Sequence, residues 1–271
     1  MTVLIGWIGV DSRRPCSAYL LSDSRASWGQ NLSTYDYCRK LFALNNSPDI
    51  LGYCGDILFS SLVLSQIASL DENELLFSRG LPSKERSDVI LRQINRQFCD
   101  YPSPARQPSS IFHISRDIDN SFRAYKYDYK TATREWERQE ETISCEVDHS
   151  SVIIVAGSGA DEFRLRYSVY QSGELTNTSR NVFQCFCDTL SHTGLTSCGG
   201  APQMVGLYNG KNNGISFGII YHGQRFFLGS PLERCPSDDS TRWYNENFEI
   251  CDGITMERKP TAMIQPKNRL K

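Results

Sequence analysis

The chain has 271 residues, of which 39% are hydrophobic, so it is long enough to bury a large core in one domain or in two small ones. Its formal net charge of -2 gives no reason to expect a nucleic acid or an anionic membrane as partner. The sequence lacks an export signal with a basic start, and no run of about 18 apolar residues predicts a membrane span. We therefore expect a cytoplasmic protein.

The ten cysteines and four histidines show no metal-binding or disulfide pattern. No C-x-x-C pair occurs, and several cysteines lie in apolar runs, where a free thiol behaves as a small hydrophobic group. The histidines are scattered without the spacing of zinc ligands. We expect no disulfide framework, no metal and no cofactor.

Apolar runs bounded by turn-forming residues predict strands, and apolar residues at helical period predict helices. The expected strands cover 1–10, 18–21, 40–44, 50–53, 110–114, 122–129, 152–156, 203–208, 214–221 and 225–228. The expected helices cover 56–70, 84–99, 160–171 and 178–192. Residues 71–82 should form a loop and 131–148 an exposed hairpin extension or loop. Residues 231–271 are polar and contain several prolines, which suits a tail or an arm laid over a neighbouring subunit.

A charged turn follows the buried run 18–21 and contains Asp23, Arg25 and Ala26. A hairpin between the first two strands would bring Asp23 back beside Thr2. The segment Met1-Thr2 precedes this turn, and two further segments follow it in order, Arg39-Lys40-Leu41-Phe42 and Leu51-Gly52-Tyr53-Cys54-Gly55-Asp56. A weaker fifth segment, Ala156-Gly157-Ser158-Gly159, comes later.

With these motifs, residues 2–230 resemble the proteasome-like family of N-terminal-nucleophile hydrolases, which includes proteasome core subunits and the peptidase of the bacterial two-component heat-shock protease. The resemblance implies an α+β fold, a four-layer αββα sandwich with two antiparallel sheets between helix pairs. The element order predicted from the residues also places a helix pair on each outer face of two sheets. We expect a domain at 1–230 and a C-terminal extension or arm at 231–271.

The resemblance also implies catalytic roles. Removal of Met1 would give Thr2 a free α-amine, a base with a pKa of about 8 next to the nucleophilic hydroxyl. Lys40, held by Asp23, would lower the proton affinity of that hydroxyl. Gly55 matches the glycine whose N–H binds the oxyanion, and Ser158 matches the serine that supports the amine. The matched supporting positions are Arg25, Gly159 and Cys198.

The sequence departs from the family pattern in two places. Cys198 stands where the family has a serine, and Leu195 stands where it has an aspartate that orients the amine. Asp188 lies upstream on a predicted helix and has no evident place in the site. The positions that match the first substrate pocket carry no charge and predict a preference for apolar or aromatic residues before the cut. They are Ala26, Cys38, Phe42, Tyr53 and Ile57.

Three functions remain open on the sequence. The first is a threonine peptidase in a homo-oligomeric ring, with access for peptide or protein substrates controlled by an ATP-dependent unfoldase or cap. The second is an inactive ring or scaffold subunit, which retention of Met1 or the loss of the aspartate at Leu195 would favour. The third is an amidase of the same mechanism that acts on a small molecule. Without the ordered motifs, Thr2 would be only the second residue, and Asp23 and Lys40 would be ordinary surface charges.

Overall fold

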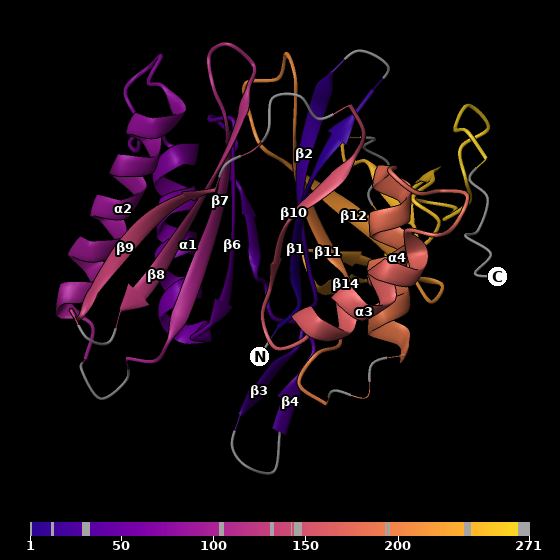
Figure 1. Cartoon of the computed structure of the whole chain (residues 1–271), viewed down its shortest axis with the longest axis horizontal. Helices are drawn as coiled ribbons and strands as arrows, with labels where there is room; N and C mark the ends of the chain where they lie inside the picture. The colour runs from indigo at the N-terminus through magenta and orange to yellow at the C-terminus, as the bar shows by residue number, and fades with distance from the viewer. Residues whose placement is uncertain are drawn as a thin grey trace.

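The computed structural model describes residues 2–11, 14–28, 33–102, 106–130, 133–141, 143, 148–192, 194, 196–235 and 240–264. These residues form 16 strands and four helices. The strands belong to a nine-stranded, a five-stranded and a two-stranded sheet. Figure 1 shows the two larger sheets side by side, with helices on the outer side of each.

The nine-stranded sheet is built around the N-terminal hairpin. Its main path runs β10-β1-β2-β11-β12-β13-β14, and β15 and β16 extend it from β12. The bounds are β1 (Leu4–Val10), β2 (Pro15–Ser22), β10 (Ser151–Ala156), β11 (Gln203–Tyr208), β12 (Ile215–Tyr221), β13 (Gln224–Phe227), β14 (Ser230–Leu232), β15 (Trp243–Asn245) and β16 (Ile250–Cys251). Leu4 pairs with Ser22, so the turn after β2 lies beside the residues that precede β1.

The five-stranded sheet is antiparallel throughout and runs in chain order from β5 to β9. Its strands are β5 (Leu41–Ala43), β6 (Asp49–Gly55), β7 (Ser109–Arg116), β8 (Phe122–Lys130) and β9 (Glu135–Glu141). The small third sheet pairs β3 (Ala26–Trp28) with β4 (Ser33–Tyr35). Apolar residues of the two larger sheets form one buried cluster, including Leu4, Leu20, Leu41, Ile50 and Ile114.

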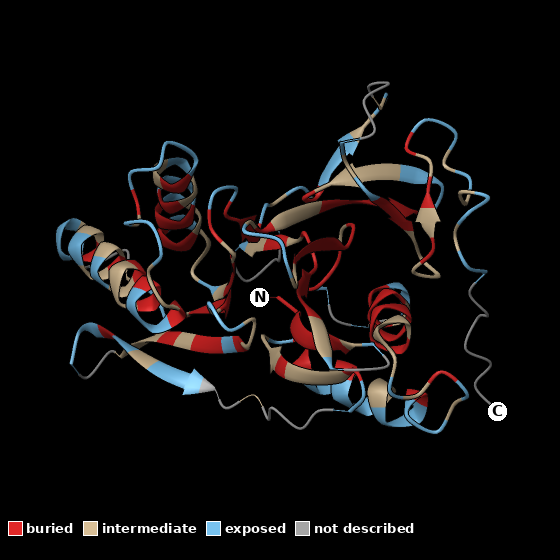
Figure 2. Ribbon diagram, turned by 90° about the horizontal axis from the view of Figure 1, so that it is seen from above, coloured by how far each residue is buried: buried red, intermediate tan, exposed pale blue. Residues whose placement is uncertain are grey.

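Each larger sheet is covered by two helices. Helices α1 (Ile57–Glu72) and α2 (Ser83–Asp100) pack on the five-stranded sheet, and α3 (Ala160–Tyr170) and α4 (Ser179–His192) pack on the nine-stranded sheet. Asp56 caps α1 because its side chain accepts from the N–H groups of Leu58 and Phe59. Figure 2 shows that the buried residues gather where the helices face the sheets.

The predicted fold class is wrong. Within the described ranges the chain is mostly β, with 16 strands in three sheets and four helices, so it is not the four-layer αββα sandwich with two antiparallel sheets. The nine-stranded sheet also contains a parallel pair, β12 with β15. Strands of two to four residues, such as β3, β14 and β16, are too short to show a period in sequence. The parallel pair depends on a long-range contact, because the Trp243 ring packs directly on Gly218.

The four helices lie within two residues of their predicted bounds at each end, and those predictions are confirmed. The segment after residue 230 differs from the expected tail, because β15 and β16 belong to the same sheet as β1. Nine cysteines fall among the described residues and are free thiols, and Cys145 lies outside them. Across the described part of the chain, no helix has the length and apolar character needed to cross a membrane.

Candidate functional site

The carboxylate of Asp23 is fully buried at the end of β2 and accepts four hydrogen bonds. Its Oδ1 accepts from Lys40 Nζ at 2.7 Å and from the Val3 N–H at 3.1 Å. Its Oδ2 accepts from the Gly199 N–H at 3.1 Å and the Arg25 N–H at 3.3 Å. The side chain of Lys40 is also fully buried. Burial of an ion pair is unfavourable unless hydrogen bonds satisfy it, and these backbone donors do so for the carboxylate.

Gln203, the first residue of β11, holds the backbone around this ion pair in place. Its Oε1 accepts from the N–H groups of Lys40 at 2.8 Å and Leu41 at 3.2 Å. Its Nε2 donates to the carbonyl oxygens of Asp23 at 3.1 Å and Cys38 at 2.9 Å. Gln203 was not among the residues predicted for the site. The only signal was a polar residue at the start of an otherwise apolar strand.

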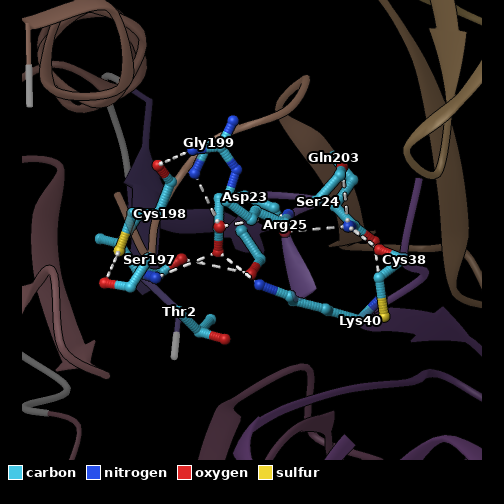
Figure 3. A network of polar contacts seen from close by, with 12 residues as sticks. Thr2, Asp23, Ser24, Arg25, Cys38, Lys40, Ser197, Cys198, Gly199 and Gln203 are labelled. Atoms are coloured by element: carbon cyan, nitrogen blue, oxygen red, sulfur yellow. Dashed lines mark hydrogen bonds and ion pairs between the residues drawn. The ribbon is translucent and has the colours of Figure 1, made fainter. Parts of the chain in front are cut away.

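Thr2 lies beside the ion pair, because the next residue, Val3, bonds the oxygen of Asp23 that Lys40 also contacts (Figure 3). The Thr2 N–H donates to Ser158 Oγ at 3.3 Å, and its carbonyl oxygen accepts from the Gly159 N–H at 3.1 Å. The site therefore gathers a hydroxyl, a cation, a carboxylate and a serine at the start of β1. Met1 lies outside the described residues.

Gly157 explains why the backbone can approach Thr2 so closely. Its φ is +88°, and a Cβ at this position would overlap the carbonyl oxygen of Thr2. A side chain would therefore be excluded by both conformation and space. Thr2 itself is almost entirely buried, with 2% of its surface exposed. A substrate can reach it only if the chain around it rearranges or is shortened.

Two further side chains approach Ser158. Its Oγ lies 3.5 Å from Ser197 Oγ and 3.7 Å from Cys198 Sγ (Figure 3 labels both residues). Burial raises the pKa of the Cys198 thiol, and the nearby charge of Asp23 raises it further. The thiol is therefore held in its neutral form near neutral pH. Ser197 was not among the predicted site residues, although it adjoins the matched Cys198.

The aspartate that the resembled family has near its equivalent of Ser158 is replaced by leucine in this sequence. Leu195, which stands at that position, lies outside the described residues. Asp188 is occupied elsewhere, because it pairs with Arg166 at 2.8 Å and His192 at 2.9 Å. The Arg166 contact ties α3 to α4 and the His192 contact lies within α4, so Asp188 has a structural role among the helices.

Arg25 links the turn after β2 to the loop that contains Gly199. Its guanidinium donates to both carboxylate oxygens of Asp36, at 2.6 and 2.8 Å, and to the Thr196 carbonyl oxygen at 3.0 Å. The hydrogen bond and charge of Arg25 outweigh partial burial and lower the pKa of Asp36. Because Gly199 donates to Asp23, Arg25 supports the buried carboxylate from outside.

Gly55 lies exposed at the end of β6. Its φ is +102°, and an added Cβ would lie 2.8 Å from Ser109 Cα and would overlap the Pro108 carbonyl oxygen. Glycine is therefore required for the local backbone, whatever its part in catalysis. Binding of an oxyanion by its N–H stays a prediction.

The five positions expected to line a substrate pocket do not share one environment. Ala26, Phe42 and Tyr53 are buried, and the last two belong to the core beneath α1. Cys38 and Ile57 are half-buried, so they retain exposed atoms. Any substrate contact at these positions would therefore involve Cys38 and Ile57 before the other three.

No cluster of three or more potential metal ligands occurs within the portion of the chain that the structure describes. Known protein-family models give no match to this chain, and a search of curated proteins also finds no match.

Proposed function

We propose that the chain is a threonine-type hydrolase that cleaves peptide bonds, with Thr2 as nucleophile once processing frees its α-amine. The observation that carries the proposal is the fully buried Asp23–Lys40 ion pair, whose carboxylate also bonds the residue next to Thr2. A buried ion pair is seldom favourable for stability alone, so its position beside a hydroxyl supports a chemical role.

In the proposed reaction, Thr2 Oγ attacks the carbonyl carbon of the substrate while the α-amine takes the hydroxyl proton. The ammonium of Lys40 favours the developing alkoxide, and Asp23 holds the ammonium in position. The Gly55 N–H would stabilise the oxyanion, and the amine returns its proton to the leaving nitrogen. Water then hydrolyses the Thr2 ester and regenerates the hydroxyl.

The hydrogen bond from the Thr2 nitrogen to Ser158 also supports this assignment, because it fixes the direction of the group that would act as base. Two glycines add to the support. Gly157 leaves room for the Thr2 carbonyl oxygen, and the Gly159 N–H donates to that oxygen. Thr2 is thus held on its nitrogen and on its carbonyl side.

The second candidate is a scaffold subunit without catalysis. The burial of Thr2 favours it, because the hydroxyl is not open to a substrate in this state. The two functions differ in one covalent feature. A processed chain begins at Thr2 and carries a free amine there, whereas an unprocessed chain lacks that base.

The test combines intact mass with hydrolysis of fluorogenic peptides and small amides. For processed protein, we expect Thr2→Ala to lose activity by several orders of magnitude and Thr2→Ser to keep part of it. Thr34→Ala, which removes an exposed hydroxyl on β4, is the matched control and should leave the rate unchanged. Hydrolysis at the wild-type rate by processed Thr2→Ala protein would exclude Thr2 as nucleophile. An unprocessed and inert wild type would favour the scaffold, and cleavage of small amides alone would favour an amidase.

A further inference from the structure

A cavity of about 660 Å³ lies at the opposite end of β6 from Gly55. Its walls come from the turn between β5 and β6, the segment between α1 and α2, and the turns that follow β7 and β11. Figure 1 shows the turns after β7 and β11 together at the top of the view, away from the N-terminus. With a rise of about 3.3 Å per residue, the seven residues of β6 separate this cavity from Gly55 by roughly 20 Å. The cavity is therefore distinct from the Thr2 site.

Arg116, at the end of β7, lines this cavity and is 6% exposed. Its guanidinium donates to Asn120 Oδ1 at 2.5 Å, to the Lys211 carbonyl oxygen at 2.7 Å and to Asn212 Oδ1 at 2.9 Å. These three acceptors are neutral. Among the described residues, no carboxylate forms an ion pair with Arg116, and its buried Nε has no protein acceptor.

A second arginine, Arg86, lines the same cavity, but its charge is compensated. Its Nε pairs with Asp49 at 2.7 Å, and its other nitrogens donate to Ser115 Oγ and to the carbonyl oxygens of Leu81 and Arg116. Burial lowers the pKa of Arg116 and the charge of Arg86 lowers it further, while Asp49 acts in the opposite direction. Arg86 Nη2 donates to the Arg116 carbonyl oxygen at 2.7 Å, so the two arginines lie next to each other in the cavity wall.

The carboxylates that line the cavity have partners of their own. Glu74 pairs with Arg79 at 3.4 Å, and Asp117 pairs with Arg123 at 3.0 Å. Asp71 accepts from the Asn46 N–H at 2.8 Å and from the Ser47 hydroxyl.

Burial raises the pKa of Asp71, and both of its carboxylate oxygens accept hydrogen bonds. Among the described residues that line the cavity, Arg116 is thus the buried cation without a carboxylate partner. Buried polar groups in folded proteins are almost always bonded to protein, water or an ion.

We propose that this cavity binds a small ligand through an oxyanion group, a carboxylate or a phosphate, that accepts hydrogen bonds from Arg116. A hydrogen bond from a charged guanidinium to either group is stronger than one between neutral partners, and the Arg116 Nε has no protein acceptor. Asn46 and Asn212 lie in the same walls and can contribute polar contacts to the rest of the ligand. This binding does not depend on the proposed hydrolysis.

The test uses inorganic phosphate and acetate as separate probes, titrated into the full chain at constant ionic strength maintained with chloride. Binding is followed through the side-chain amide resonances of Asn46 and Asn212, which report on the cavity itself. We expect saturable shifts with at least one of the two anions, and the stronger one identifies the ligand class. Arg116→Gln should weaken binding by roughly tenfold or more, because a hydrogen-bonded charge is lost.

Arg164→Gln is the matched control, since Arg164 lies on α3 in an exposed ion pair with Asp161, and it should bind like the wild type. If Arg116→Gln does not fold, the wild type still tests the proposal through its resonances. The absence of saturable shifts with both anions would overturn it, as would shifts that Arg116→Gln leaves unchanged. If only a water molecule bonds the Arg116 Nε, neither anion would give saturable shifts.

Discussion

Removing one partner of the Asp23–Lys40 ion pair should have unequal effects on folding stability. In Lys40→Met the carboxylate loses one charged donor but keeps the N–H groups of Val3, Arg25 and Gly199. Loss of one hydrogen bond to a charged group costs about 1.5–3 kcal/mol. The methionine also retains most of the packing of the lysine chain. We therefore expect a decrease of that size in the free energy of unfolding.

Asp23→Asn should be more destabilising. The lysine ammonium then loses a carboxylate at 2.7 Å while both side chains stay fully buried. The asparagine amide also places N–H donors where backbone donors already point. Breaking a buried ion pair in this way costs about 3–5 kcal/mol. Because the two residues share one interaction, the double variant should lose less than the sum of the single losses.

Urea unfolding followed by circular dichroism at pH 7 measures these differences. Arg79→Gln is the control, because its contact with Glu74 is exposed, and surface pairs of this kind contribute at most about 1 kcal/mol. Equal losses for Lys40→Met and Asp23→Asn, or the larger loss for Lys40→Met, would refute the view that the backbone donors compensate the carboxylate.

Three further predictions concern the surroundings of the site and the core. Gln203→Leu should lower the free energy of unfolding by more than about 2 kcal/mol, because it leaves buried backbone groups without hydrogen-bond partners. Gln203→Glu should recover part of this loss, because its carboxylate oxygen can still accept from the backbone N–H groups. The urea midpoints of both variants measure these differences. Gly157→Ala should lower the free energy of unfolding by about 1–3 kcal/mol, because its φ is positive and its Cβ would overlap the Thr2 carbonyl oxygen, and an unchanged melting temperature would contradict this. Burial raises the pKa of Asp49, but its bond to His113 and the nearby cations outweigh this and hold the pKa below the ordinary value. The contribution of the Asp49 carboxylate to the free energy of unfolding should therefore be present above about pH 4 and lost as the pH falls through its lower pKa in the folded state. The free energy of unfolding should thus fall less steeply with acid in Asp49→Asn than in the wild type.

The sequence by itself determined the elements that depend on neighbouring residues. The helices at 57–72 and 83–100 follow from apolar residues at helical spacing, and the start of the helix at 160–170 follows from the preceding Gly157-Ser158-Gly159. The N-terminal hairpin follows from two apolar runs joined by a short polar turn. This hairpin also accounts for the nearness of Asp23 to Thr2, because the register of two adjacent strands is a local property.

Tertiary structure decided the rest. The parallel pairing of β15 with β12 and the direct packing of Trp243 on Gly218 join residues that no local pattern connects. Gln203 reaches Lys40 across more than 160 positions of sequence, and Gly199 reaches Asp23 over a similar separation. Contacts of this kind form only when the sheets pack together. The free energy for that packing comes from burying apolar surfaces that lie far apart in the sequence, so no local sequence pattern can predict them.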